Sequence, residues 1–106
     1  MTNTKQPGID ISRQKPGTMI CVQTTIHLYE LTLVDPATGL ITLGGDDQRC
    51  IGLTGQFLHS EYGDDVVEDW VGRSMKMHIR FKNAVLVTAA AIAGSVHGDG
   101  WEYTVF

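Results

Sequence analysis

The sequence has no run of apolar residues that approaches the roughly 20 needed to cross a bilayer as a helix. Its first eight residues, MTNTKQPG, lack the apolar segment of a secretory signal. The chain also has only three prolines and two cysteines among its 106 residues. These absences predict a cytoplasmic protein without a membrane partner.

The residue spacings typical of catalytic and metal sites are also absent. Ser60, Ser74 and Ser95 lack a GxSxG elbow, and no glycine-rich loop leads into a helix with a phosphate-binding lysine. The four histidines show neither HxxxH nor HExxH spacing (His27, His59, His78 and His97). We therefore predict a protein that is not an enzyme and needs no cofactor. A metal site would require several of these side chains to converge from separate strands.

The two cysteines, Cys21 and Cys50, are too far apart in sequence for a metal knuckle, and neither belongs to a CxxC motif. In an intracellular chain, such cysteines are more often buried thiols than a disulfide. We expect structural thiols. A bridge between them is the alternative, provided that their strands are neighbours.

Length and composition indicate one globular unit. A chain of this length buries about 65% of its unfolded surface, enough for a single core. The formal net charge of -4 argues against a protein that coats nucleic acid, so that partner is disfavoured. We predict a flexible N-terminal arm over residues 1–16 and a single β domain over residues 17–106.

Turn residues divide the rest of the chain into strands. Asp35-Pro36-Ala37-Thr38-Gly39 is the clearest reversal, and a break at Thr24-Thr25 separates two apolar patterns of opposite phase. We expect a bent strand over 50–58, a polar surface loop over 60–69 and a hairpin at 98–100. Residues 85–93 favour a strand, with a helix as the alternative. Together these elements predict an all-β fold, a small antiparallel barrel or sandwich of six to eight short strands.

The most informative segment is 75–82, where large apolar residues alternate with basic ones. A strand would place the apolar residues on a core face and four basic side chains on the other face (Lys76, His78, Arg80 and Lys82). These four are the candidate binding residues, because an anion laid along them would gain from each charge. The structural alternatives are protection of an exposed sheet edge, or neutralisation by acids such as those in the segment 64–69.

A set of residues spread over about residues 18–97 resembles an uncharacterised family of small bacterial β-domains. Its members here are Thr24, Tyr29, Gly44-Gly45, Gly55, Gly72, Met75-Lys76-Met77 and Thr88. The chain has Ala89-Ala90-Ala91 where that family has Ser-Pro-Val after the late threonine. The resemblance implies an all-β domain and brings no activity, cofactor or partner with it.

Two functions fit these features. The first is a noncatalytic binding or assembly module, in which an exposed strand or the basic face contacts another protein or a second copy of the chain. The second is a small barrel that binds single-stranded nucleic acid, with the basic strand along the phosphates and Trp101 or Tyr103 stacking on bases. The first requires no basic excess and is the prediction that we favour.

Overall fold

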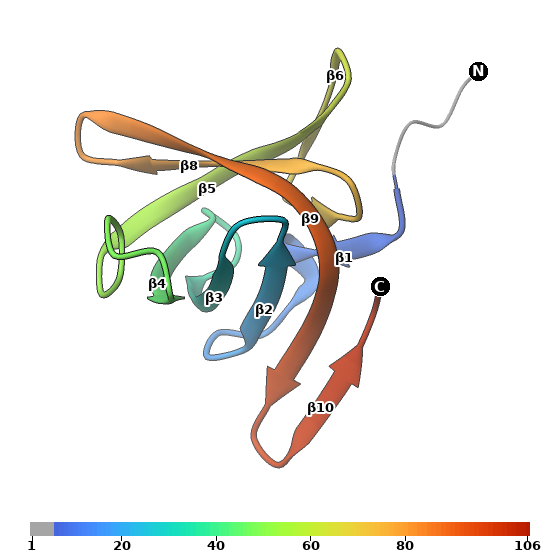
Figure 1. Ribbon diagram of the computed structural model, residues 1–106. Helices are drawn as coiled ribbons and strands as arrows, with labels where there is room; N and C mark the ends of the chain where they lie inside the picture. The colour runs from blue at the N-terminus through green and yellow to red at the C-terminus, as the bar shows by residue number, and fades with distance from the viewer. Residues whose placement is uncertain (1–5) are drawn as a thin grey trace.

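The computed structural model describes residues 6–106, and most of its regular structure is β-strand (Figure 1). Every strand pair is antiparallel, so the predicted antiparallel all-β fold is confirmed. A short 3-10 helix, η1 (Ile11–Arg13), accompanies the strands. The strands are β1 (Gly8–Asp10), β2 (Met19–Thr24), β3 (Leu28–Asp35), β4 (Leu40–Gly45), β5 (Thr54–Tyr62), β6 (Asp65–Glu68), β7 (Trp70–Gly72), β8 (Lys76–Phe81), β9 (Ala84–Gly98) and β10 (Trp101–Thr104).

Six of these strands close into a barrel. Strands β2 to β5 follow one another as hairpin neighbours, β8 pairs with both β5 and β9, and β9 pairs with β2. The 15-residue β9 makes the closure possible, because its first half pairs with β8 and its second half with β2. A register shift at Gln23/Thr24 marks the change of partner. Strands β6 and β10 are attached outside this ring, to β5 and β9.

The interior of the barrel is a packed apolar core. Along β2, β3 and β4 the side chains alternate between core and surface, as the pleat requires. Ile20, Leu31, Ile41 and Met77, from four different strands, have no exposed surface. The largest buried side chains are Tyr29 and Phe57. Because side chains fill the interior, any binding surface must lie on the outside or at the rim.

Two of the predicted turns are confirmed. Strand β3 ends at Asp35 and β4 begins at Leu40, and Gly39 adopts the positive φ (78°) that the reversal requires. The expected break after β2 is a turn in which the Thr24 hydroxyl oxygen accepts from the His27 N–H and donates to the His27 carbonyl. This turn reverses the phase of the pattern between Val22 and Tyr29, both of which are buried.

Two predicted elements are wrong in their boundaries. Residues 46–53 form a loop rather than the first part of a strand, and β5 starts at Thr54. Residues 60–62 then continue β5, and β6 folds back on it as a hairpin, where a surface loop was expected. The polar composition of this segment fits a hairpin that projects from the barrel, because both of its faces then meet solvent (Figure 1).

The N-terminal segment is bonded to the rest of the domain from residue 6 onward, because the carbonyl oxygens of Gln6 and Pro7 accept hydrogen bonds from Trp70 and Arg73. Strand β1 pairs with β7 in a separate two-stranded sheet, and Ile9 and Ile11 belong to the core. Residues 8–13, within the predicted arm, are therefore part of the packed domain, whereas residues 1–5 lie outside the described residues. Residues 6–106 contain no helix with the length and apolar character needed to cross a membrane.

Candidate functional site

The predicted basic face lies on β8. Met75, Met77 and Ile79 are fully buried, as the alternation predicts. Lys76 and Arg80 are exposed on the outer surface and His78 is partly buried there. Lys82 lies beyond the strand, in the β8–β9 turn, with a positive φ of 40°. Three of the four predicted binding residues therefore share one strand, and the fourth is at the hairpin tip.

Protection of a sheet edge does not explain this face, because β8 is not an edge strand. It pairs with β5 on one side and with β9 on the other. The acidic segment 64–69 does not lie beside β8, because β5 lies between β8 and β6. The acid that meets the basic face is Glu61 on β5, 3.2 Å from Nε2 of His78. Arg80 donates to the side-chain oxygen of Gln56, also on β5.

A pair of histidines completes the face. The His59 and His78 rings lie 4.4 Å apart between centroids, with an interplanar angle of 31°. Burial, followed by the neighbouring His78, lowers the pKa of His59. The face thus combines two exposed cations with a close pair of tilted histidine rings, one of which lies beside a carboxylate.

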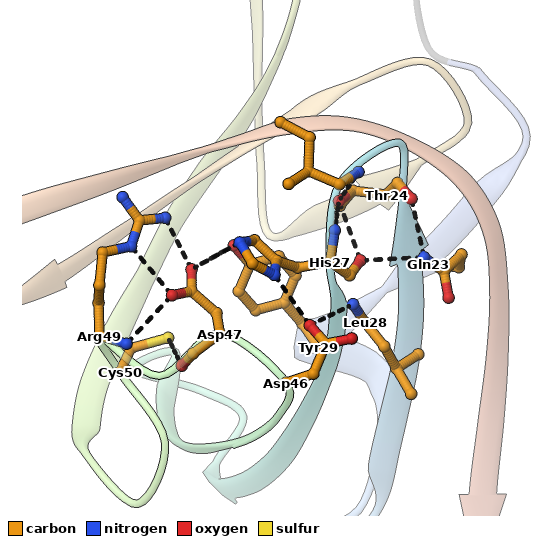
Figure 2. Close-up of polar contacts among 10 residues, drawn as sticks. Gln23, Thr24, His27, Leu28, Tyr29, Asp46, Asp47, Arg49 and Cys50 are labelled. Atoms are coloured by element: carbon orange, nitrogen blue, oxygen red, sulfur yellow. Dashed lines mark hydrogen bonds and ion pairs between the residues drawn. The ribbon is translucent and has the colours of Figure 1, made fainter.

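A second polar cluster surrounds the buried carboxylate of Asp47 in the loop between β4 and β5 (Figure 2). Tyr29 donates its hydroxyl to Asp47 at 2.7 Å, and Arg49 donates from Nε at 2.9 Å and from Nη2 at 2.8 Å. The Arg49 hydrogen bonds hold the pKa of Asp47 well below its usual range. Burial, followed by the hydrogen bond to Asp47, raises the pKa of Tyr29. The cluster fastens the loop to β3.

No local sequence pattern indicates the Asp47 cluster, because its Tyr29 and Asp47 are 18 positions apart. Two aspartates after a glycine pair are typical of a turn, which explains exposed Asp46 but not buried Asp47. Cys50, also buried, donates its thiol to the Asp47 carbonyl oxygen at 3.6 Å. Both cysteines are free thiols, so the alternative bridge is wrong, and Cys50 is buried whereas Cys21 is only partly buried.

The hairpin of β9 and β10 leaves an open strand edge. β10 pairs with β9, and within residues 6–106 it has no second strand neighbour. Gly94 and Phe106 exchange main-chain hydrogen bonds of 3.1 and 3.2 Å at the end of this ladder. Val105 also donates its N–H to the Gly94 carbonyl oxygen at 2.9 Å, so Val105 and Phe106 form a bulge opposite Gly94. Hydrogen-bonded pairs alternate along an antiparallel ladder, and counted from Val105 they are Tyr103 with Val96 and Trp101 with Gly98. The N–H and C=O groups of Glu102 and Thr104 therefore point away from β9.

The same strand carries exposed aromatic side chains. Trp101 is 49% exposed and Tyr103 is 69% exposed. Together with Val105 they line a shallow hollow that Gln14 and Val96 complete. Exposed aromatic residues beside unpaired main-chain groups are typical of surfaces that bind another chain.

The other outlying strand of the main sheet, β6, differs in character. Asp65 and Glu68 stand at its two ends, and Asp64 precedes it. Charged side chains on an edge oppose pairing with another strand. In contrast, Glu102 is the only charged residue of β10. Of the two strands outside the ring, β10 is therefore the better docking edge.

A further constellation lies on the outer face of the same hairpin. Ser95 Oγ is 2.8 Å from Nε2 of His97, and Nδ1 of His97 is 3.7 Å from Glu102 Oε1. Ser95 is not part of a GxSxG elbow, so that motif does not indicate this cluster. The Ser-x-His spacing on one strand, followed by a tight turn, was the signal for this cluster. Chemically, His97 can accept the Ser95 proton, but the carboxylate is beyond hydrogen-bonding distance of the ring.

Apart from the His59–His78 pair, the histidines lie on separate parts of the surface. Within residues 6–106, no three His, Cys, Asp or Glu side chains group together so that they could hold a metal ion. No protein-family model matches the chain, and neither the curated proteins nor the solved structures include a match. The resemblance to a bacterial β-domain family therefore stays a prediction, and the site must be judged on its geometry.

Proposed function

We propose that the protein is a noncatalytic assembly module that binds a protein strand along the free edge of β10. The observation that carries this proposal is the coincidence of unpaired main-chain groups at Glu102 and Thr104 with exposed aromatic side chains at Trp101 and Tyr103. Strand addition draws affinity from main-chain hydrogen bonds and specificity from alternate side chains. The β10 edge offers both.

The position of β10 supports the same proposal. In Figure 1, β10 lies below the barrel at the lower end of β9, and no other ribbon lies along its outer edge. The hairpin is anchored by Phe106, which is buried against the core after the bulge at Val105. An edge held in place by a buried anchor loses little conformational entropy when a partner pairs with it.

The nucleic-acid function receives less support, because the basic residues and the aromatic residues that it requires lie far apart. The basic residues are on β8, which pairs with the first half of β9, whereas Trp101 and Tyr103 are opposite the last residues of β9. Figure 1 shows β8 and β10 at opposite ends of that strand. Backbone contacts and base stacking would have to act on distant parts of one oligonucleotide.

The proposal is tested by removing one outward-facing N–H group. Thr104→Pro deletes the N–H that points away from β9, and proline is tolerated on an edge strand at such a position. Thr104→Ala is the matched control, because it removes the side chain and keeps the N–H. The Thr104→Ala variant should still recover a partner protein from native extract, and the Thr104→Pro variant should not. Circular dichroism should show that the two variants are folded to the same extent. Full recovery with Thr104→Pro would contradict the proposal.

A further inference from the structure

We infer that the strand added to β10 is the β10 of a second copy of this chain, antiparallel to the first, with the two-fold axis passing between the two Tyr103 residues. This inference rests on the proposed function and names its partner. It follows from the symmetry of strand pairing, from the direction of the main-chain groups and from the position of the one charged residue.

Symmetry first limits the possible registers. A two-fold axis perpendicular to the sheet returns each side chain to the face from which it came. Residues that meet across the new ladder must therefore belong to the same face of β10, which alternates along the strand. Within this short strand, the axis can pass at Glu102 or at Tyr103.

The main-chain groups favour the axis at Tyr103. In that register Glu102 of each copy faces Thr104 of the other, and both residues direct their N–H and C=O groups outward. Each copy presents two donors and two acceptors, so four hydrogen bonds form. With the axis at Glu102, Thr104 would face Gly100, which lies in the turn with a φ of 78°. Only the two bonds between the Glu102 residues would then form in regular geometry.

The side chains favour the same register. An axis at Glu102 places two carboxylates directly opposite each other, and like charges at facing positions destabilise a ladder. An axis at Tyr103 instead places each carboxylate beside a threonine. It also pairs the two Tyr103 rings and sets Trp101 opposite Val105 of the second copy. The apolar side chains of the hollow thus cover one another.

Self-complementarity is the reason to name a second copy as the partner. In this register each outward main-chain group of β10 finds a group of the opposite kind on an identical strand. The one carboxylate avoids its own image, and the exposed aromatic side chains meet. A single short strand therefore provides both halves of an isologous interface.

Disulfide trapping tests the register. Facing residues of a non-hydrogen-bonded pair have Cα atoms about 4.5 Å apart, which suits a disulfide. Tyr103→Cys, in a Cys21→Ser background, should therefore form a covalent dimer under mild oxidation. Glu102→Cys is the matched control and should stay monomeric on reducing-agent-free gels, because its two sulfur atoms would be two residues out of register. Sedimentation equilibrium of the unmodified chain should give the mass of a dimer.

Two results would overturn the inference. Cross-linking by Glu102→Cys but not by Tyr103→Cys would move the axis, and a monomeric unmodified chain at all concentrations would remove the second copy. If that monomer still recovers another protein in a manner that Thr104→Pro abolishes, the inference fails and the proposed function stands. If neither self-association nor such recovery occurs, both fail.

Discussion

Gly94 and Phe106 exchange two main-chain hydrogen bonds, and the Phe106 ring occupies the space beside the glycine. A Cβ atom on residue 94 would lie 2.5 Å from two atoms of that ring. The pair ends the β9–β10 ladder and determines which groups of β10 face outward. The absence of a side chain at position 94 is therefore connected to the docking edge.

Gly94→Ala should displace the Phe106 ring and lower the free energy of unfolding by about 1–3 kcal/mol, the usual cost of overpacking. In a Phe106→Ala background the same substitution should cost close to nothing, because the clashing ring is gone. Urea denaturation of the four variants of this cycle measures the difference. An equal cost of Gly94→Ala in both backgrounds would show that the ring does not occupy this space.

Asp47→Asn should destabilise the protein by about 2 kcal/mol at neutral pH, because hydrogen bonds to a buried carboxylate are lost or weakened. Asp46→Asn is the control, since Asp46 is exposed and pairs with His27 at 2.9 Å. Its expected cost is under about 1 kcal/mol. Equal effects of the two substitutions on the unfolding midpoint would contradict the role assigned to the buried carboxylate.

The buried Asp47 carboxylate should also make the stability of the protein depend on pH. The pKa of Asp47 is lower in the folded protein than its ordinary value of 3.8, so the folded state favours the charged form. The contribution to stability is therefore complete above about pH 4 and is lost as the pH falls below that value. The stability difference between the unmodified protein and Asp47→Asn should shrink over this range. A difference independent of pH down to acid unfolding would contradict this explanation.

Reversing two charges tests the basic face. Lys76→Glu combined with Arg80→Glu should leave self-association unchanged, because β8 and β10 lie at opposite ends of β9. We also expect the unmodified protein to show no salt-sensitive binding to labelled single-stranded oligonucleotides, measured by fluorescence anisotropy at low salt. Binding that weakens with salt and disappears in the double variant would instead support the nucleic-acid function.

Ser95 should not react as a hydrolase nucleophile, although His97 lies within hydrogen-bonding distance of it. The N–H groups of Val105 and Phe106, close to Ser95 in the ladder, both donate to the Gly94 carbonyl oxygen. They are therefore not free to stabilise an oxyanion. A fluorophosphonate probe should label the protein no more than it labels Ser95→Ala. Labelling that disappears in both Ser95→Ala and His97→Gln would establish a catalytic site.

Local patterns predicted the strands and turns that depend on neighbouring residues. The alternation at 75–82 predicted the buried and exposed faces of β8. The residues Asp35 to Gly39 predicted a hairpin, because the backbone preferences of turn residues are local. The way in which the barrel closes could not be predicted from the sequence, because it depends on β9 changing from one partner strand to another. A periodic pattern does not reveal where a strand changes its neighbour.

The candidate site was harder to predict for the same reason. Trp101 and Tyr103 were visible as aromatic residues of a terminal strand, but their exposure depends on which side of β9 receives β10. Conversely, the basic residues of β8 formed a conspicuous pattern, and tertiary pairing placed them between two strands beside Glu61. The sequence indicates which residues share a strand face, whereas the fold decides which edge stays open.

Amide hydrogen exchange as a function of protein concentration tests the central claim most directly. The amides of Trp101 and Tyr103 bond to β9 and should be protected at every concentration. Those of Glu102 and Thr104 should exchange rapidly in dilute solution and become protected as the concentration rises, because a second β10 then pairs with them. Rapid exchange at Glu102 and Thr104 that is independent of concentration would contradict the proposed assembly of two copies through β10.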